Sequence, residues 1–146
     1  MGMSTAFGVS CALALSLLSQ AQQTSPAKPY EPTSGMAGKD VVWVPTSPAL
    51  LEKMLDLAKV TPQDFVMDLG SGDGRNVIAA GKRGARAMGV EYNPDMVELS
   101  RQKAKEAGVS DKVTFVQGDM YEADISKASV MALFLLPSNL EKLKDK

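Results

Sequence analysis

An acidic residue followed by alternating glycines is the part of this chain whose residue types and spacing could bind a ligand. Residues 66–75 read VMDLGSGDGR, with an apolar run before the acid and helix-forming residues after the last glycine. A strand, a glycine turn and a helix in this order bring backbone amides close to a nucleotide-like ligand. Glycine suits the turn because it adopts left-handed backbone angles and has no Cβ to hold the ligand away. We expect the ligand to contact Asp68, Gly70, Ser71, Gly72 and Gly74.

The spacing of these glycines separates the turn from two other nucleotide-binding loops. A dinucleotide-binding fingerprint has the spacing G-x-G-x-x-G, and a phosphate-binding P-loop ends in Gly-Lys-Ser or Gly-Lys-Thr. This turn has the spacing G-x-G-x-G and continues as Gly74-Arg75-Asn76. An acid beside the turn would also repel a pyrophosphate in a partly buried cleft. The pattern therefore favours a ligand with a positively charged end.

Two more acidic residues follow predicted strands further along the chain. Residues 84–90 form a short strand-like segment that ends at Glu91, and residues 113–117 form another that leads through Gly118 to Asp119. A carboxylate at the tip of the second strand, about twenty residues beyond the glycine turn, can accept hydrogen bonds from both hydroxyls of a ribose. Acids at three successive strand ends predict one shared binding edge.

These motifs together resemble the class I (seven-strand) S-adenosylmethionine-dependent methyltransferases, whose cofactor carries an ammonium and a sulfonium. The resemblance rests on the glycine turn, Glu91 and Asp119. It implies that the first acid and the turn hold the amino-acid end of S-adenosyl-L-methionine and that Glu91 holds the ribose. It also implies that Asp119 and Met120 orient the adenine. Asn93, two residues beyond Glu91, completes the expected cofactor-binding set.

A segment before the first predicted helix narrows the resemblance. Residues 43–46 read Trp-Val-Pro-Thr, and with DLGSGDGR they are similar to the small methyltransferases that modify lysine on mitochondrial membrane proteins and to their bacterial relatives. This similarity implies transfer of a methyl group to an acceptor such as a protein lysine. It makes Trp43 and Thr46 candidates for substrate binding or site closure. No catalytic residue is identified, and the Asp/Asn-Pro-Pro-aromatic motif of methyltransferases acting on nucleic-acid amines is missing after the fourth predicted strand.

Strands alternating with helices must position these residues. The fourth strand, residues 130–136, is apolar throughout, as expected for a strand buried on both faces. Ser47 and Asn93 are predicted helix N-caps, each followed by proline, and Gly108 is a predicted helix end. The pattern predicts an α/β fold with a doubly wound, mostly parallel sheet of the Rossmann-like methyltransferase type. Because that fold normally has three further strands, the domain is expected to be truncated after the fourth.

Composition excludes several classes of chemistry. The chain has 146 residues, no histidine, one cysteine (Cys11) and a formal net charge of −1. A histidine base and a Cys/His zinc site are therefore excluded, and no metal is expected. Sixteen basic against seventeen acidic residues give little support for nucleic-acid binding. No apolar stretch reaches the roughly twenty residues that a transmembrane helix needs.

The N-terminal part has a different composition. Residues 1–21 resemble a signal peptide, with an apolar run over 6–18 and small residues at the expected cleavage positions, although no Lys or Arg precedes the run. Residues 22–39 are rich in Pro, Ser, Gly and Thr and are expected to be a disordered linker, which leaves 40–146 as the cofactor-binding part of the domain. A true leader predicts a periplasmic or secreted protein. An ordinary N-terminal helix predicts a cytoplasmic one, where S-adenosylmethionine is available.

Two other functions remain open at this point. One is an NAD-dependent oxidoreductase of related fold, which the glycine spacing and Asp68 disfavour. The other is a non-catalytic, truncated module that binds the cofactor without transferring its methyl group.

Overall fold

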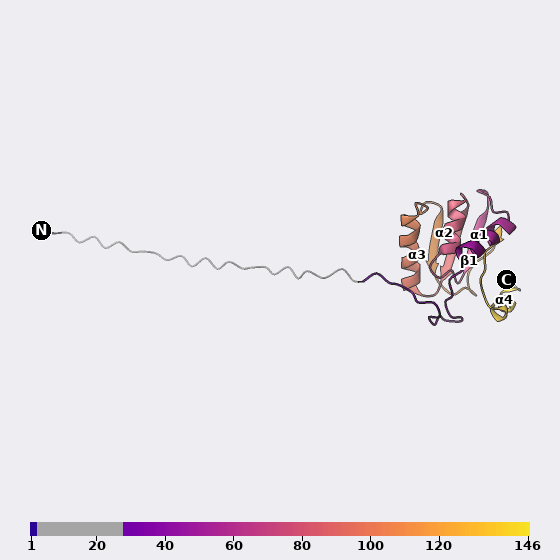
Figure 1. Cartoon of the computed structure of the whole chain (residues 1–146). Coiled ribbons are helices and arrows are strands. Elements are labelled where there is room, and N and C mark those ends of the chain that lie inside the picture. The colour runs from indigo at the N-terminus through magenta and orange to yellow at the C-terminus, as the bar shows by residue number, and fades with distance from the viewer. Residues whose placement is uncertain (3–27) are drawn as a thin grey trace.

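The computed structural model describes residues 1–2 and 28–146, and within them it places four parallel strands in one sheet. The strands are ordered β3-β2-β1-β4, and helices alternate with strands along the chain as far as β3 (Figure 1). In chain order the elements are α1 (Pro48–Leu57), β1 (Phe65–Leu69), α2 (Arg75–Lys82), β2 (Arg86–Glu91), α3 (Pro94–Glu106), β3 (Val113–Gln117), β4 (Val130–Met131) and α4 (Pro137–Leu143). The predicted α/β fold with a parallel sheet is confirmed.

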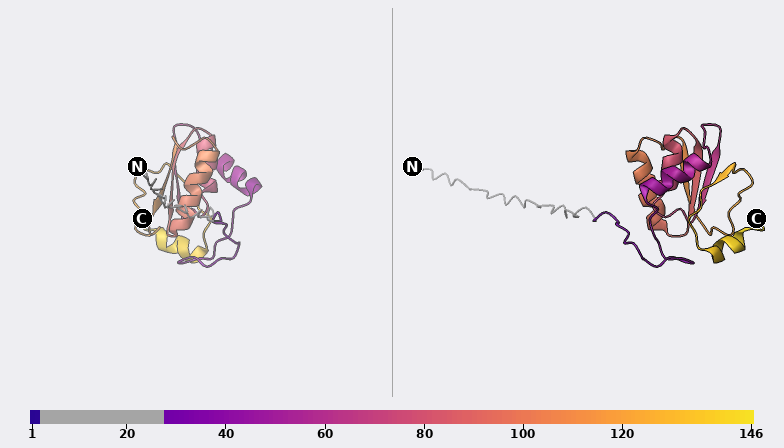
Figure 2. Two further views of the ribbon diagram at one scale, coloured as in Figure 1. Left: turned by 90° about the vertical axis from the view of Figure 1, so that its left-hand side faces the viewer. Right: turned by 45° about the vertical axis from the view of Figure 1, so that its right-hand side comes forward.

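The two faces of the sheet are covered differently (Figure 2). On one face α2 and α3 bury a core that includes Val66 and Val77, and α1 packs on α2. On the other face Met67 is covered by apolar side chains of the 118–129 segment and by Leu143 of α4. The strand order reverses between β1 and β4. In open α/β sheets ligands bind at such a reversal, outside the carboxyl ends of the strands.

The predicted helix caps are confirmed. The Ser47 hydroxyl accepts a hydrogen bond from the Leu50 amide at 3.3 Å, and the Asn93 carbonyl oxygen Oδ1 accepts one from the Asp95 amide at 2.9 Å. Gly108 follows α3 with a φ of 70°, as a helix-ending glycine should. Within the described parts of the chain, no helix combines the length and the apolar character that a membrane span requires.

The fourth strand is much shorter than predicted. Only Val130 and Met131 pair as a strand, both with β1, and Phe134 and Leu136 are 50% and 56% exposed. Residues 132–136 do not pair as a strand, and Val130 and Met131 are only half-buried, so the prediction of a strand over 130–136 buried on both faces is wrong. In the described part of the chain β4 has a neighbour only on its β1 side, and a strand is buried throughout only where other elements cover it.

The expected signal peptide lies, apart from its first two residues, outside the described part of the chain, as do residues 22–27 of the expected linker. Residues 35–43, in contrast, form a hairpin. The Gly35 amide donates to the Trp43 carbonyl at 2.8 Å, and the Trp43 amide donates to the Met36 carbonyl at 2.8 Å. The hairpin therefore crosses the predicted boundary between residues 39 and 40.

Candidate functional site

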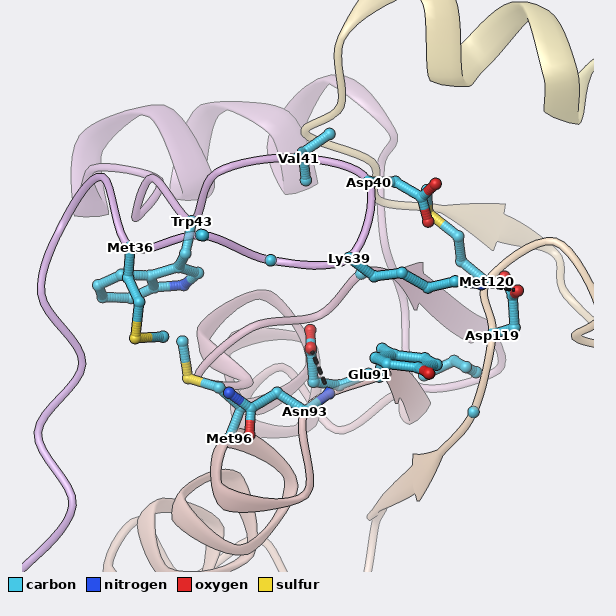
Figure 3. Close-up of a pocket in the computed structure, with 16 residues that line it drawn as sticks. Met36, Lys39, Asp40, Val41, Trp43, Glu91, Asn93, Met96, Asp119 and Met120 are labelled. Atoms are coloured by element: carbon cyan, nitrogen blue, oxygen red, sulfur yellow. Dashed lines mark hydrogen bonds and ion pairs between the residues drawn. The ribbon is translucent and has the colours of Figure 1, made fainter.

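Two adjoining cavities lie at the carboxyl ends of β1, β2 and β3, and they share Gly70 and Trp43. The first lies beneath the hairpin 35–43 (Figure 3), and the predicted site residues on its wall are Gly70, Glu91, Asn93, Asp119 and Met120. The second is lined by residues that include Thr46, Asp68, Ser71, Gly72, Asn76 and Phe134. The predicted shared edge is therefore present, with Glu91 and Asp119 in one cavity and Asp68 in the next.

Both carboxylate oxygens of Glu91 accept hydrogen bonds from the backbone. Oε2 accepts from the Gly72 amide at 2.8 Å, and Oε1 accepts from the Asn93 amide at 2.9 Å. These bonds orient the carboxylate and connect the glycine turn to the end of β2. Because an ionised carboxylate has about four lone-pair sites, each oxygen can still accept a further hydrogen bond from a ligand hydroxyl.

Asp119 is paired with a residue of the hairpin (Figure 3). Its Oδ1 accepts from the Tyr121 amide at 2.9 Å, and its Oδ2 accepts from the Lys39 ammonium. The hydrogen bond from Lys39 lowers the pKa of Asp119, and the same bond raises the pKa of Lys39. The Lys39 nitrogen also lies 5.0 Å from the centre of the Tyr92 ring. Lys39 therefore contacts the very carboxylate that the sequence assigned to the adenine.

Two glycines of the turn lie on the cavity walls with backbone angles that other residues rarely adopt. Gly70 and Gly72 have φ values of 75° and 55°, in the left-handed region that favours glycine. A Cβ on Gly72 would lie 2.5 Å from the indole nitrogen Nε1 of Trp43. Trp43 thus packs directly on the turn, and any larger residue at 72 would displace it.

Gly74 and the Ser71 hydroxyl occupy packing positions. Gly74 lines neither cavity, and a Cβ on it would lie 2.6 Å from a ring carbon of Phe115 and 2.8 Å from Cβ of Ser100. Gly74 therefore lies apart from both cavities, and its missing side chain makes room for β3 and α3. Ser71 lines the second cavity, but its hydroxyl packs against Gly89 of β2. A Cβ on Gly89 would lie only 2.5 Å from the Ser71 Oγ.

Asp68 is a buried carboxylate, 3% exposed, beside an unpaired carbonyl oxygen. Among the described residues, the only hydrogen bond to its carboxylate comes from the Asn76 amide nitrogen at 3.0 Å. Burial raises the pKa of Asp68 to about 8, and the charges of Glu91 and Asp73 add to the shift. The Asn76 oxygen Oδ1 is itself buried without a hydrogen-bond partner. Such a pair of acceptors suits a cationic donor such as an ammonium.

Several residues of the cavities were not predicted as site residues. They include Met36, Lys39, Asp40, Tyr92 and Met96 in the first cavity and Asn76 in the second. The hairpin was missed because its composition is typical of a linker. Asn76 could have been found, because it is a polar residue that directly precedes the apolar helix residues 77–80. In the described residues, no group of three or more His, Cys, Asp or Glu is placed to hold a metal ion.

Comparison with known proteins gives relatives of one kind. The model of a family described as the ANTKMT methyltransferase domain matches residues 68–146. A protein-lysine N-methyltransferase from Saccharolobus islandicus is 40% identical over 108 residues, which cover 73% of this chain and 67% of the relative. An adenine nucleotide translocase lysine N-methyltransferase from Mus musculus is 41% identical over 107 residues, which cover 73% of this chain but 46% of the relative. The chain spans about half the length of the mouse protein.

Solved structures agree on the fold and the cofactor. An RNA methyltransferase from Salinibacter ruber in complex with S-adenosyl-L-homocysteine is 53% identical, with a TM-score of 0.68 over 70% of this chain and 67% of that one. A methyltransferase from Geobacter sulfurreducens with the same ligand is 26% identical, with a TM-score of 0.59 over 67% of this chain and 43% of that one. The glycine turn, the strand-end acids and these matches lead to one conclusion. The chain belongs to the ANTKMT methyltransferase domain family of S-adenosylmethionine-dependent methyltransferases.

Proposed function

We propose that this protein transfers the methyl group of S-adenosylmethionine to a lysine side chain of a protein, with the cofactor bound across the two cavities. The observation that carries the proposal is the arrangement of Asp68, Glu91 and Asp119 at the ends of β1, β2 and β3. The lysine acceptor is supported by the two relatives described as lysine N-methyltransferases.

The residues present fit this cofactor. The backbone at Gly70 is exposed on the wall of both cavities, as close approach of a ligand requires, whereas Gly72 is buried beneath Trp43. The buried carboxylate of Asp68 and the orphaned oxygen of Asn76 provide acceptors for a cationic end. Glu91, on the wall of the first cavity, retains acceptor capacity for ribose hydroxyls.

These residues bind three different parts of the cofactor. Asp68 and Asn76 receive the ammonium of the cofactor's amino-acid end. Glu91 receives the ribose, and Asp119 receives the adenine amino group once Lys39 has moved from its carboxylate. Each acid lies at or just beyond the carboxyl end of a different strand of one sheet, so the sheet sets the spacing between the three contacts.

The cofactor supplies a methyl group that its sulfonium already makes reactive. The chain's residues then contribute binding, orientation and exclusion of water. A lysine acceptor must arrive as a neutral amine, and the chain has no histidine to take its proton. Burial in an apolar setting lowers the pKa of an amine, so desolvation beside Trp43 and Phe134 favours loss of that proton to water.

Calorimetric titration with S-adenosylhomocysteine tests the binding half of the proposal. We expect Glu91→Ala to weaken binding by about tenfold or more, because a carboxylate that accepts ligand and backbone hydrogen bonds is lost. Glu98→Ala is the matched control, because Glu98 is an exposed acid on α3. Equal affinity in the two variants, or stabilisation by NAD instead of S-adenosylhomocysteine, would contradict the assigned site.

Labelled S-adenosylmethionine tests the acceptor. The full chain is incubated with cell lysate, and the products are separated into hydrolysed protein and total RNA. Label in methylated lysine supports the proposal. Label in RNA would show instead that the acceptor is RNA, as the name of the Salinibacter ruber relative suggests. Binding of S-adenosylhomocysteine without any transfer would identify a cofactor-binding module instead of an enzyme.

We also propose that residues 1–21 direct export, which rests on the sequence pattern alone. Mass spectrometry of the protein from expressing cells tests this directly. A mature chain beginning at residue 22 supports export, and an intact N-terminus assigns the protein to the compartment that holds its cofactor.

A further inference from the structure

We infer that Arg75 is a positioning residue that holds the Trp43–Thr46 segment against the glycine turn and so places the wall between the two cavities. The inference goes beyond the proposed cofactor contacts, because the hydrogen bonds of Arg75 all go to protein groups, although its side chain also lines the second cavity. Its turnover readout rests on the proposed function, and its spectroscopic readout does not.

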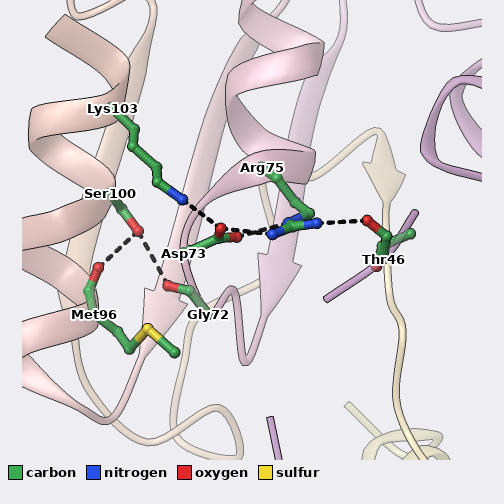
Figure 4. A network of polar contacts seen from close by, with 7 residues as sticks. All are labelled: Thr46, Gly72, Asp73, Arg75, Met96, Ser100 and Lys103. Carbon is green, nitrogen blue, oxygen red and sulfur yellow. Dashed lines mark hydrogen bonds and ion pairs between the residues drawn. The ribbon is translucent and has the colours of Figure 1, made fainter. Parts of the chain in front are cut away.

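Arg75 is anchored by a buried carboxylate (Figure 4). Asp73 is 2% exposed, and Arg75 binds both its oxygens, with Nε donating to Oδ1 and Nη2 to Oδ2, each at 2.8 Å. Lys103 of α3 donates to the same Oδ2 at 2.6 Å. Burial alone would raise the pKa of Asp73, but the hydrogen bonds from Arg75 and Lys103 outweigh it and lower that pKa. The carboxylate is ionised and fixes the plane of the guanidinium.

The remaining end of the guanidinium reaches the N-terminal segment. Nη1 donates to the Thr46 carbonyl oxygen at 2.8 Å (Figure 4). The guanidinium carbon also lies 5.9 Å from the centre of the Trp43 ring. One side chain therefore connects the first residue of α2 with both ends of the segment 43–46.

This connection matters because Trp43 lines both cavities. Its indole rests on Gly72, and Thr46, at the other end of the segment, is buried on the wall of the second cavity. A shift of the segment would move the surface that an acceptor must pass to reach the methyl group. Small errors in such positioning reduce turnover strongly without removing a chemical group.

Charge neutralisation alone does not explain this geometry. Lys103 of α3 already supplies a cation to Asp73. Only the planar guanidinium offers three donors that can serve a carboxylate and a backbone carbonyl together. Lysine at position 75 would keep the charge but lose this bridge.

Trp43 is the one tryptophan of the chain, so intrinsic fluorescence reports on the segment directly. We compare Arg75→Lys with Lys103→Gln, each of which removes part of the Asp73 network. Acrylamide quenching of the indole is expected to rise about twofold in Arg75→Lys because the segment opens locally. In Lys103→Gln we expect quenching as in the unchanged protein. Equal quenching in both variants, or none above the unchanged protein in Arg75→Lys, overturns the inference.

A second pair of variants tests the inference if the first variants fold poorly. Asp73→Asn and Asp73→Asn/Arg75→Gln both lack the buried charge and differ only in the guanidinium. The inference requires higher quenching in the double variant than in Asp73→Asn.

The kinetic readout separates positioning from cofactor binding. We expect Arg75→Lys to lower kcat by about tenfold or more, as misplacement of an acceptor would. Its affinity for S-adenosylhomocysteine should stay within about twofold of the unchanged protein, because Arg75 lines the second cavity but makes its hydrogen bonds to Asp73 and Thr46. A loss confined to that affinity, with kcat unchanged, refutes the positioning role. Failure of the unchanged protein to bind S-adenosylhomocysteine would refute the proposed function and leave the fluorescence comparison valid.

Discussion

Cofactor binding is expected to strengthen as the pH rises, because Asp68 must lose a proton before it can pair with a cation. In the ligand-free protein burial raises the pKa of Asp68 to about 8, so the carboxyl group is largely protonated at neutral pH. An ammonium placed beside it and Asn76 favours the ionised form. Binding and ionisation of Asp68 are therefore coupled.

The size of the effect follows from that pKa. If the cofactor binds only the ionised form, the apparent Kd is multiplied by one plus the ratio of protonated to ionised Asp68. With a pKa of about 8 the factor is about 33 at about pH 6.5 and about 1.3 at about pH 8.5, so affinity rises about 25-fold across this range. At about pH 7, binding releases about 0.9 proton per site.

Calorimetry with S-adenosylhomocysteine measures both quantities. Titrations at several pH values give the affinity, and titrations in buffers of different ionisation enthalpy give the released protons. Asp68→Asn is the control, because it keeps the shape and removes the ionisation, so any titration of the ligand itself remains visible in it. A pH profile for the unchanged protein parallel to that of Asp68→Asn would refute the coupling.

The stability of the ligand-free protein should show the opposite trend. The folded-state pKa of Asp68 is raised above its ordinary value, so the folded chain binds this proton more tightly than the unfolded chain. Its contribution to the free energy of unfolding is therefore lost as the pH rises towards about 8 and is constant above it. Asp68→Asn should lack this loss in urea denaturation, and an identical pH dependence in both proteins would contradict the buried, uncompensated carboxyl group.

Two further substitutions test the surroundings of the site. Lys39→Gln should tighten S-adenosylhomocysteine binding about two- to fivefold, because the adenine no longer competes with Lys39 for the carboxylate of Asp119. The control Lys105→Gln, which changes an exposed lysine, should leave the affinity unchanged. Weaker binding in Lys39→Gln would show that Lys39 helps to hold the ligand. Gly74→Ala should lower the free energy of unfolding by about 2 kcal/mol more than Gly108→Ala in urea titrations, because both glycines have positive φ but only Gly74 lacks room for a Cβ. Equal losses would mean that backbone strain alone matters at Gly74.

Local sequence signals predicted most of the elements correctly. The caps at Ser47 and Asn93 and the glycine after α3 depend on neighbouring residues only, so they could be read without the fold. The prediction of a buried strand over the run 130–136 failed because apolar composition shows only that a segment can be buried. It does not show how many strands pair with that segment. Burial of that run depends on what lies beyond β4.

The site was predicted in part for a similar reason. Acids after parallel strands necessarily meet at one edge of a sheet, so Glu91 and Asp119 could be brought together from the pattern alone. Lys39 could not, because it lies 80 residues from its partner Asp119 in a segment with the composition of a linker. Gly74 could not be separated from the neighbouring glycines, because its close approach to Phe115 arises from packing between α2 and β3.

By itself the sequence determined the class of ligand and the strand–turn–helix unit that receives it. Alternating glycines, a preceding acid and two later strand-end acids are local features, so they can be recognised from residue types and their order in the chain alone. Only the tertiary structure decided how the site is closed and tuned. The hairpin over the first cavity, the burial that raises the pKa of Asp68 and the reach of Arg75 to Thr46 all arise from contacts between segments distant in the chain. Such contacts depend on the packing of the whole domain, and no local pattern encodes them.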